Sequence, residues 1–341
     1  MNLQALSLQS VINFMKEEIK NGIAVAGTVL VDSINEITAY PQCGRLTQIT
    51  NIEKSVGGCV PNVAVDIKKI CPWIDVQAIG KIGDDQDGKF ILDTLLCENI
   101  NISGIVTSEN KLTSKTEVMS VVNGQRTFFT YTGASAGFGY SDIDFQSLNV
   151  KLFHLGYFLL LQKVDSGDGI RILKKLKEMG IETSIDLVSE NSDRYSIVLP
   201  CLKYVDYLII NETEAGNLTG INPTDDNIEN IAKKLKSLGV CKKVIIHKPD
   251  FSVCLSDEGY VEVNSYLLPN DYIKGTTGAG DAFCAGALIG IYKGLSDKQI
   301  LEFASACAVL SLGKPDATSG LVCEYEIIEY CKKFKRIERE N

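Results

Sequence analysis

Regular alternation of apolar strand-like runs with helix-like segments in the second half of the chain is the strongest constraint on its fold. After Phe145, strands are predicted at residues 152–156, 182–187, 205–210 and 243–247. Helices are predicted at residues 168–179, 225–238, 279–293 and 297–311. Strands that alternate with helices form a mostly parallel sheet covered on both faces. We therefore expect a three-layer α/β sandwich around a mostly parallel central sheet.

Two regions in the first half of the chain do not follow this rhythm. Residues 35–55 contain short strand-like pieces at 36–39 and 46–49, and residues 113–133 contain two longer ones. The second region has the two-residue sequence Asn-Gly at 123–124, which is a strong signal for a hairpin turn. We expect the two regions to come together as a small β lid on the larger domain.

The chain of 341 residues is near the size at which a single core stops growing. Residues 3–20 predict an N-terminal helix, because the apolar side chains of Leu8, Ile12, Met15 and Ile19 fall on one helical face. That helix either packs on the main domain or binds a partner. We expect a helical extension over residues 1–20 and one domain over residues 21–341.

Composition excludes several classes of function. The net charge of −9 disfavours a nucleic acid partner, because an acidic surface repels a polyanion. The 11 cysteines form no C-x-x-C pair and the two histidines are far apart, so a structural zinc site is disfavoured. Scattered cysteines favour a reducing compartment. With no signal peptide and no run of 18 apolar residues, we expect a cytoplasmic protein without a membrane partner.

The most informative segment is the glycine-rich run Gly-Thr-Thr-Gly-Ala-Gly-Asp at residues 275–281, followed by a helix-compatible sequence. Small residues before a helix let a ligand approach the free N–H groups of the first turn, where the helix dipole is positive. Asp281 at the edge of such an anion site can accept the proton of an attacking hydroxyl. It can equally be a simple helix cap. The run matches neither a Walker P-loop nor G-x-G-x-x-G.

The segment Thr-Thr-Gly-Ala-Gly-Asp at 276–281 resembles the C-terminal signature of the ribokinase-like (PfkB) carbohydrate kinases. Other motifs of that family occur in the same order along the chain. They are Gly27 with Asp32, Gly-Gly-Cys-Val-Pro-Asn at 57–62, the glycine-spaced turn at 80–88 and Asn-Glu-Thr-Glu at 211–214. The resemblance covers roughly residues 23–321 and implies a Rossmann-like sandwich with a β lid.

The resemblance also implies roles for individual residues. Asp281 is the general base, and the backbone amides of Gly278, Ala279 and Gly280 form the anion hole. Sugar binding is expected from Asp32, Gly57, Gly58 and Asn62. Nucleotide binding is expected from Thr276, Gly278, Gly280, Asn211 and Glu214. Of these, Asn211 and Glu214 act on Mg²⁺ through its water ligands.

The sequence departs from the family at three places. Gly275 stands where many members carry an aspartate that helps to bind a monovalent cation, so potassium activation is not expected. Leu30 replaces a polar residue of ribokinases proper, so ribose is not the default substrate. On the nucleotide side, Pro249 and Ser252 replace two glycines of the strand that begins at residue 244. His247 and Lys248 are then either compensating ATP contacts or a strand-end residue and a solvated charge.

The expected function is transfer of the γ-phosphate of ATP, with Mg²⁺, to a hydroxyl of a monosaccharide or similar small polyol, most simply a primary hydroxyl. One alternative is a nucleoside kinase of the same fold, and another is a non-catalytic sugar- or nucleotide-binding regulator. Because a lid of a few strands has exposed edges, a homodimer through the lid is also expected.

Overall fold

The computed structural model describes residues 20–121, 126–190 and 192–339. The N-terminal helix predicted at 3–20 lies outside these residues except for its last position, and so does the Asn-Gly turn at 123–124.

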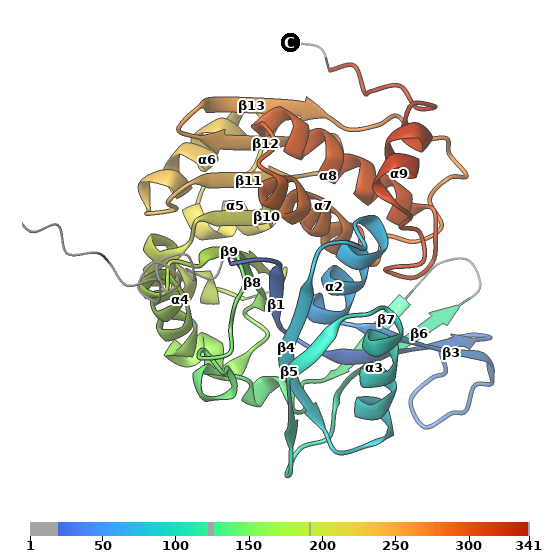
Figure 1. Ribbon diagram of the computed structural model, residues 1–341. Coiled ribbons are helices and arrows are strands. Elements are labelled where there is room, and N and C mark those ends of the chain that lie inside the picture. Colours follow the sequence, from blue (N-terminus) through green and yellow to red (C-terminus); the bar gives the residue numbers. More distant parts are fainter. Residues whose placement is uncertain (1–19, 122–125, 191, 340–341) are drawn as a thin grey trace, which may run out of the picture.

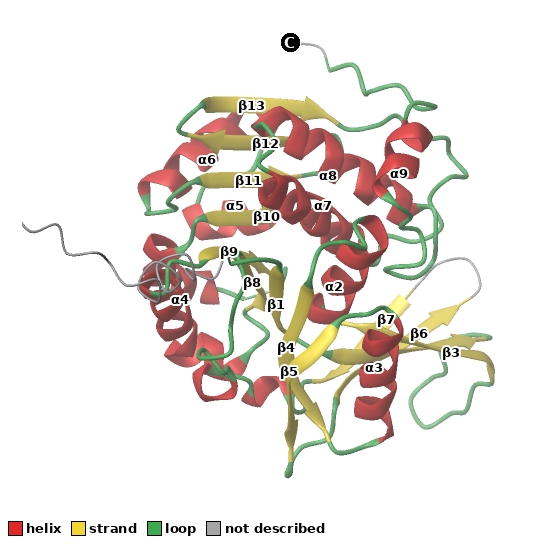
Figure 2. Cartoon of the chain, viewed as in Figure 1, coloured by secondary structure: helices red, strands yellow, loops and turns green. Residues whose placement is uncertain are grey.

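A nine-stranded sheet forms the centre of the molecule (Figure 2). Its strands are β1 (Ile23–Gly27), β4 (Val76–Gly83), β5 (Asn101–Ser108), β8 (Leu152–Phe158), β9 (Glu182–Leu187), β10 (Tyr207–Asn211), β11 (Lys243–His247), β12 (Phe251–Ser256) and β13 (Gly259–Asn264). Across the sheet they follow the order β13-β12-β11-β10-β9-β8-β1-β4-β5. All neighbours are parallel except β11 with β12 and β12 with β13.

The order of the strands reverses beside β1. From β1 the chain continues to β4 and β5 on one side, whereas β8 pairs with the opposite edge of β1 and leads to β13. Ile23 of β1 is in register with Val76 of β4 and with Leu152 of β8. Ligands of open α/β sheets bind outside the carboxyl ends of the strands at such a switch point.

Helices cover both faces of this sheet (Figure 1). One face carries α2 (Cys59–Ile70), α3 (Gln86–Cys97), α7 (Ala279–Lys293), α8 (Asp297–Leu312) and α9 (Glu324–Cys331), and the other carries α4 (Gly169–Glu178), α5 (Glu212–Thr219) and α6 (Ile228–Ser237). Alternate residues of β1 point to opposite cores, with Ile23 and Val25 in the first and Ala24 and Ala26 in the second. The predicted three-layer α/β fold is confirmed.

A separate sheet of four strands, called here the small sheet, lies beside α3 (Figure 1). Its strands are β2 (Leu30–Ile37), β3 (Ile49–Gly57), β6 (Ser114–Val121) and β7 (Arg126–Tyr131), in the order β3-β2-β6-β7. The strand pieces expected at 36–39 and 46–49 are wrong in position, because β2 begins earlier and β3 runs later. Polar residues interrupt both strands, buried ones such as Ser33 and Asn35 in β2 and exposed ones at 50–51 and 53–54 in β3, so apolar runs do not mark them.

The chain near the nucleotide-side strand also differs from the expectation. The strand predicted at 243–247 is β11, but the strand does not continue to Ser252, because β11 ends at His247 and the antiparallel β12 begins at Phe251. Pro249 stands in the turn between them, where its missing N–H is no loss to the sheet. Edge strands β5 and β13, and helices α5 and α9, were not predicted.

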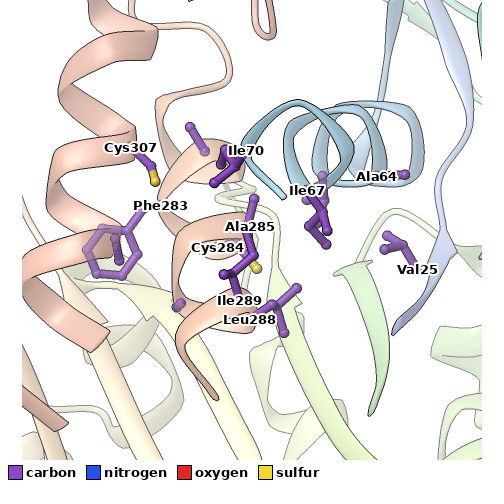
Figure 3. Close-up of a cluster of buried hydrophobic side chains, with 14 of the residues drawn as sticks. Val25, Ala64, Ile67, Ile70, Phe283, Cys284, Ala285, Leu288, Ile289 and Cys307 are labelled. Carbon is purple, nitrogen blue, oxygen red and sulfur yellow. The ribbon is translucent and has the colours of Figure 1, made fainter. Parts of the chain in front are cut away.

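Helix α7 is buried along nearly its whole length (Figure 3). Its residues pack between α2 and α8, and Gly286 allows the closest approach to α8. A Cβ added at Gly286 would lie 2.8 Å from Ala304 Cα and 2.9 Å from Cys307 Sγ. The helix is therefore fixed in the core by contacts on several sides.

Each of the 11 cysteines is a free thiol. Within the described ranges, the search for a helix both long and apolar enough to span a bilayer finds none.

Candidate active site

A cavity of ≈ 180 Å³ lies at the carboxyl ends of the central strands. Tyr157 of β8, Asp186 of β9, Asn211 of β10 and His247 of β11 all line it. The first turn of α7 closes the cavity from the other side with Gly278, Gly280 and Asp281. The structure thus brings the predicted base and the predicted Asn-Glu-Thr-Glu motif into one cavity, although 70 residues separate them in sequence.

A second cavity of ≈ 530 Å³ adjoins the first and shares Asn211, His247 and Gly280 with it. Much of its lining is apolar, including Leu268, Ile273, Phe283, Val309 and Leu312, and Thr276 and Ala279 also line it. An apolar slot that opens into a polar cavity beside a helix N-terminus suits a nucleotide, whose base is flat and whose phosphates are anionic.

Asp281 is buried in the first turn of α7 and is held by two donors. The Asn62 Nδ2 amide donates to Asp281 Oδ2 at 2.8 Å, and the Tyr157 hydroxyl donates to the same oxygen at 3.0 Å. Burial raises the pKa of Asp281 to about 6, and the two hydrogen bonds oppose that increase. The N-cap of α7 is Gly278, so Asp281 is not the cap of this helix.

Gly278 and Gly280, at the start of α7, differ in how much room they leave for a side chain. Gly278 has φ +80°, and a Cβ there would lie 2.4 Å from Ala317 Cβ, so no other residue fits this turn. A Cβ at Gly280 would meet nothing closer than His247 at 3.8 Å. The first N–H groups of a helix have no intrahelical acceptor, and Gly278, Gly280 and Asp281 at the start of α7 line the smaller cavity.

The predicted sugar-side residues lie together on the other side of Asp281. Asp32 is half-buried on β2, and a Cβ at Gly57 would lie 2.1 Å from its Oδ2. Gly58 has φ +84° and starts α2, the helix that carries Asn62. Burial and the nearby carboxylate of Asp281 raise the pKa of Asp32 to about 7. Gly57 therefore lets the Asp32 carboxylate approach the chain just before α2, whereas a Cβ at Gly58 would meet Thr28 O at 2.6 Å.

Two buried polar atoms near this point have no hydrogen-bond partner among the described residues. They are the amide oxygen Asn62 Oδ1 and the hydroxyl Thr28 Oγ1. An orphaned buried acceptor is costly, and such atoms are normally satisfied by water or by a ligand. Their chemistry suits a ligand that carries several hydroxyl groups.

Asn211 and Glu214 form a capping box at the start of α5. Asn211 Oδ1 accepts from Glu214 N at 2.9 Å, and Glu214 Oε2 accepts from Asn211 N at 3.1 Å. Ser189 Oγ donates to Glu214 Oε1 at 2.8 Å. Burial raises the pKa of Glu214 to about 8, so a cation beside this carboxyl would favour its charged form.

The donor set of the smaller cavity fits a divalent cation such as Mg²⁺. Carboxyl groups of Asp186, Glu214 and Asp281 converge there, and none of the described residues that line it is Lys or Arg. Oxygen ligands are those that Mg²⁺ prefers. Because the oxygens of Asn211 and Glu214 are engaged in the capping box, they are suited to contact the cation through water.

His247 and Lys248 have different environments. The His247 ring stacks on Phe283 with 4.7 Å between centroids, and burial lowers its pKa to about 4, so the ring is neutral at physiological pH. Lys248 lines the larger cavity, but its ammonium forms an ion pair with Asp225 and lies over the Phe251 ring. The charge of Lys248 is thus engaged by the protein itself.

Gly275 lies where a larger residue has no room. A Cβ there would lie 2.9 Å from each of the carbonyl oxygens of Lys314 and Pro315. A carboxylate side chain therefore cannot replace this glycine in the observed backbone conformation.

Sequence reasoning did not find Tyr157, Asp186 and Ser189. Tyr157 has φ +57°, a left-handed conformation that is unusual for a tyrosine, and its N–H donates to Asp186 Oδ1 at 2.5 Å. The available signal was position, because both residues stand at the carboxyl ends of predicted parallel strands.

The sequence model described as pfkB family carbohydrate kinase matches residues 24–322. This chain belongs to the PfkB family. Among similar PfkB proteins, a ribokinase of Arabidopsis thaliana is 26% identical over 314 residues, which cover 91% of this chain and 81% of that protein. Fructokinase-1 of Zea mays is 25% identical over 331 residues, which cover 90% and 96%.

Solved structures share the fold of this PfkB chain. The structure of Arabidopsis thaliana ribokinase complexed with ribose and ATP superposes with a TM-score of 0.79 at 24% identity, covering 92% of this chain and 99% of that chain. A Methanocaldococcus jannaschii nucleoside kinase superposes with a TM-score of 0.74 at 20% identity, covering 92% and 98%. The predicted ribokinase-like fold and family are confirmed. The relatives do not fix which molecule accepts the phosphoryl group.

Proposed function

We propose that this PfkB kinase transfers the γ-phosphate of ATP to a primary hydroxyl of a monosaccharide or similar small polyol. The observation that carries the proposal is the Asp281 carboxylate, buried at the start of α7 and held by Asn62 and Tyr157 between a nucleotide-sized space and two orphaned polar atoms. The ribokinase and fructokinase relatives support a sugar as the acceptor.

On the nucleotide side, the base of ATP would occupy the larger cavity and its phosphates would extend toward α7. The first-turn amides at residues 278–280 would stabilise negative charge on the transferring phosphoryl group, and the helix dipole adds to this effect. Phosphoryl transfer depends mainly on alignment of the reacting groups and on stabilisation of their charge. Helix α7, which is fixed in the core, would contribute to both.

On the acceptor side, Asp32 and Asn62 Oδ1 would accept hydrogen bonds from sugar hydroxyls. Asp281 would then accept the proton of the attacking hydroxyl on Oδ1, because Asn62 and Tyr157 already occupy Oδ2. The two hydrogen bonds hold the carboxylate in one orientation. Asn62 thus contacts the base and the acceptor with the two ends of one amide.

Mg²⁺ bound with ATP would supply positive charge against the triphosphate. Asn211 and Glu214 would hold the cation's water ligands from the start of α5. The same residues keep one another oriented through the capping box.

The small sheet would act as a lid over the acceptor. Arg126 of β7 already reaches the glycine-rich loop, where its Nη1 donates to Thr277 Oγ1 at 3.4 Å. Closure of this sheet would exclude water that could otherwise accept the phosphoryl group. The free thiols support a reducing compartment such as the cytoplasm.

We expect the protein to form a homodimer through the small sheet. Three apolar side chains on it are largely exposed, Ile52 at 63% and Phe128 and Phe129 at 59% each, and β3 and β7 leave two open edges. Light scattering at micromolar concentration should give the mass of two chains. Combining Phe128→Asp with Phe129→Asp should halve that mass, and a wild-type mass of one chain would contradict the expectation.

The pH dependence of kcat/KM should show the titration of Asp281. Only the ionised carboxylate can accept a proton, and its pKa is raised to about 6, so kcat/KM should fall about tenfold per pH unit below that value. Tyr157→Phe removes a hydrogen bond that favours the charged form, so it should move this acid limb to higher pH. If kcat/KM is the same one pH unit below the Asp281 pKa of about 6 as it is above that pKa, Asp281 is not the base.

A screen of ADP release over pentoses, hexoses, ketoses and nucleosides tests the proposal. Turnover with a sugar or polyol supports it, and preferential turnover of a nucleoside would replace it by a nucleoside kinase. The remaining alternative is a non-catalytic regulator, and calorimetry on the same compounds measures binding without transfer. Binding of ATP and a sugar without transfer to any acceptor would identify a non-catalytic regulator.

A further inference from the structure

Close to Asp281, three buried side chains from distant parts of the sequence bring nitrogen, oxygen and sulfur donors together. They are His154 of β8, Asp186 of β9 and Cys284 of α7, and their donor atoms all lie within 4.8 Å of one another. His154 Nε2 is 3.5 Å from Asp186 Oδ2 and 3.6 Å from Cys284 Sγ. Ligands of a tetrahedral zinc ion, with bonds of about 2.0–2.3 Å, are separated by about 3.3–3.6 Å.

We propose that His154, Asp186 and Cys284 form a binding site for a borderline-soft divalent cation of the Zn²⁺ type, beside the Mg²⁺ whose water ligands Asn211 and Glu214 would hold. Imidazole and thiolate ligands select zinc-like ions, whereas Mg²⁺ prefers an all-oxygen set.

Neighbouring hydrogen bonds already orient two of the three ligands. His154 Nδ1 lies 3.1 Å from Ser184 Oγ on the adjacent strand, which leaves Nε2 facing the other donors. Asp186 Oδ1 is engaged by the N–H of Tyr157, which leaves Oδ2 facing His154. Such outer contacts fix ring orientation and ligand direction in metal sites.

The site has an entrance and a suitable charge. Asp186 and Cys284 line the smaller cavity, so an ion can reach them and a water from the cavity can complete a fourth position. A second thiol borders the cluster, since a Cβ added at Gly156 would lie 2.6 Å from Cys59 Sγ and 3.0 Å from His154 Nε2. None of the described residues lining this cavity is Lys or Arg, so the converging carboxyl groups have no cation beside them.

Binding must displace the thiol proton of Cys284. The S–H bond breaks as the sulfur–metal bond forms, and the proton leaves to solvent.

Titration of the full chain with Co²⁺ tests the site without any measurement of kinase activity. Wild type should bind one Co²⁺ with a sulfur-to-cobalt charge-transfer band and tetrahedral visible bands, and one equivalent of Zn²⁺ should remove both. Cys284→Ala should abolish the charge-transfer band. Ser184→Ala keeps all three ligands and should weaken binding by roughly 10–100-fold, the usual effect of losing an outer contact.

The matched control is Cys307→Ala, another buried cysteine on the neighbouring helix α8, which should bind as wild type does. A band that persists in Cys284→Ala would overturn the proposal, because an exposed thiol such as Cys323 would then be the ligand. Absence of any charge-transfer band in wild type would also overturn it. If Cys284→Ala does not fold, His154→Gln decides, since binding equal to wild type would exclude His154 as a ligand.

Discussion

Asp281→Asn should lower kcat by roughly 10²–10⁴-fold, the usual contribution of a positioned general base. The amide keeps the shape of the side chain and can still contact Asn62 and Tyr157, but it cannot take a proton from the acceptor hydroxyl. Since the loss belongs to the transition state, it should appear in kcat more than in KM. Calorimetry should find ATP and sugar bound to within a modest factor of wild type.

Asp297→Asn is the matched control for this substitution. Asp297 is also a buried aspartate in the first turn of a helix, but it pairs with Lys243 and lies away from both cavities. Its replacement should lower stability and leave kcat near wild type. If Asp281→Asn turns over within a few-fold of wild type, the proposed mechanism is wrong.

Removal of divalent cations with EDTA should abolish turnover, and excess Mg²⁺ should restore it. The smaller cavity gathers the carboxyl groups of Asp186, Glu214 and Asp281, and none of its described lining residues is Lys or Arg. Without a cation, the triphosphate of ATP would meet these carboxylates with only backbone amides in compensation. EDTA already loaded with Mg²⁺ is the control and should have no effect.

Persistent turnover in metal-free buffer would count heavily against this account of the site. A second chelation experiment separates the two cation sites proposed here. A zinc-selective chelator should remove an ion held by Cys284 and leave Mg²⁺-dependent turnover in place.

The bounds of helices and strands inside the core were predicted well. The bounds of exposed strands and of strands at the edge of a sheet were not. Strands β8, β9 and β11 and helices α7 and α8 were placed close to their observed bounds, because most of the residues in each are buried. Edge strand β5 is only partly buried along its length, so no apolar run marks it. In β3, residues 49–54 are exposed, and the small sheet was therefore predicted with displaced strands.

The site was predictable where a local motif carries it. The glycine-rich loop, Asp281 and Asn62 each lie in a short motif, and the geometry supports a role for all of them. Contacts between distant segments could not be predicted, such as the hydrogen bond from Asn62 to Asp281 across 219 residues. Tyr157 belongs to the same class, because its hydroxyl acts only after β8 is placed beside α7.

The proposed site of His154, Asp186 and Cys284 could not be predicted from the sequence either. Spacing of cysteines and histidines finds sites whose ligands come from one short segment. His154, Asp186 and Cys284 come from two strands and a helix that meet only in the folded sheet. Neither composition nor spacing contains that arrangement.

The proposed base lies on helix α7, whereas two residues on the acceptor side lie on the small sheet. This separation has a consequence for how such a protein can evolve. Asp281 starts a helix wedged between α2 and α8, where most substitutions would disturb the core. Asp32 and Arg126, by contrast, belong to the small sheet, whose outer positions tolerate change. Selection for a new acceptor can therefore act on the small sheet while the chemistry of phosphoryl transfer is inherited unchanged on α7.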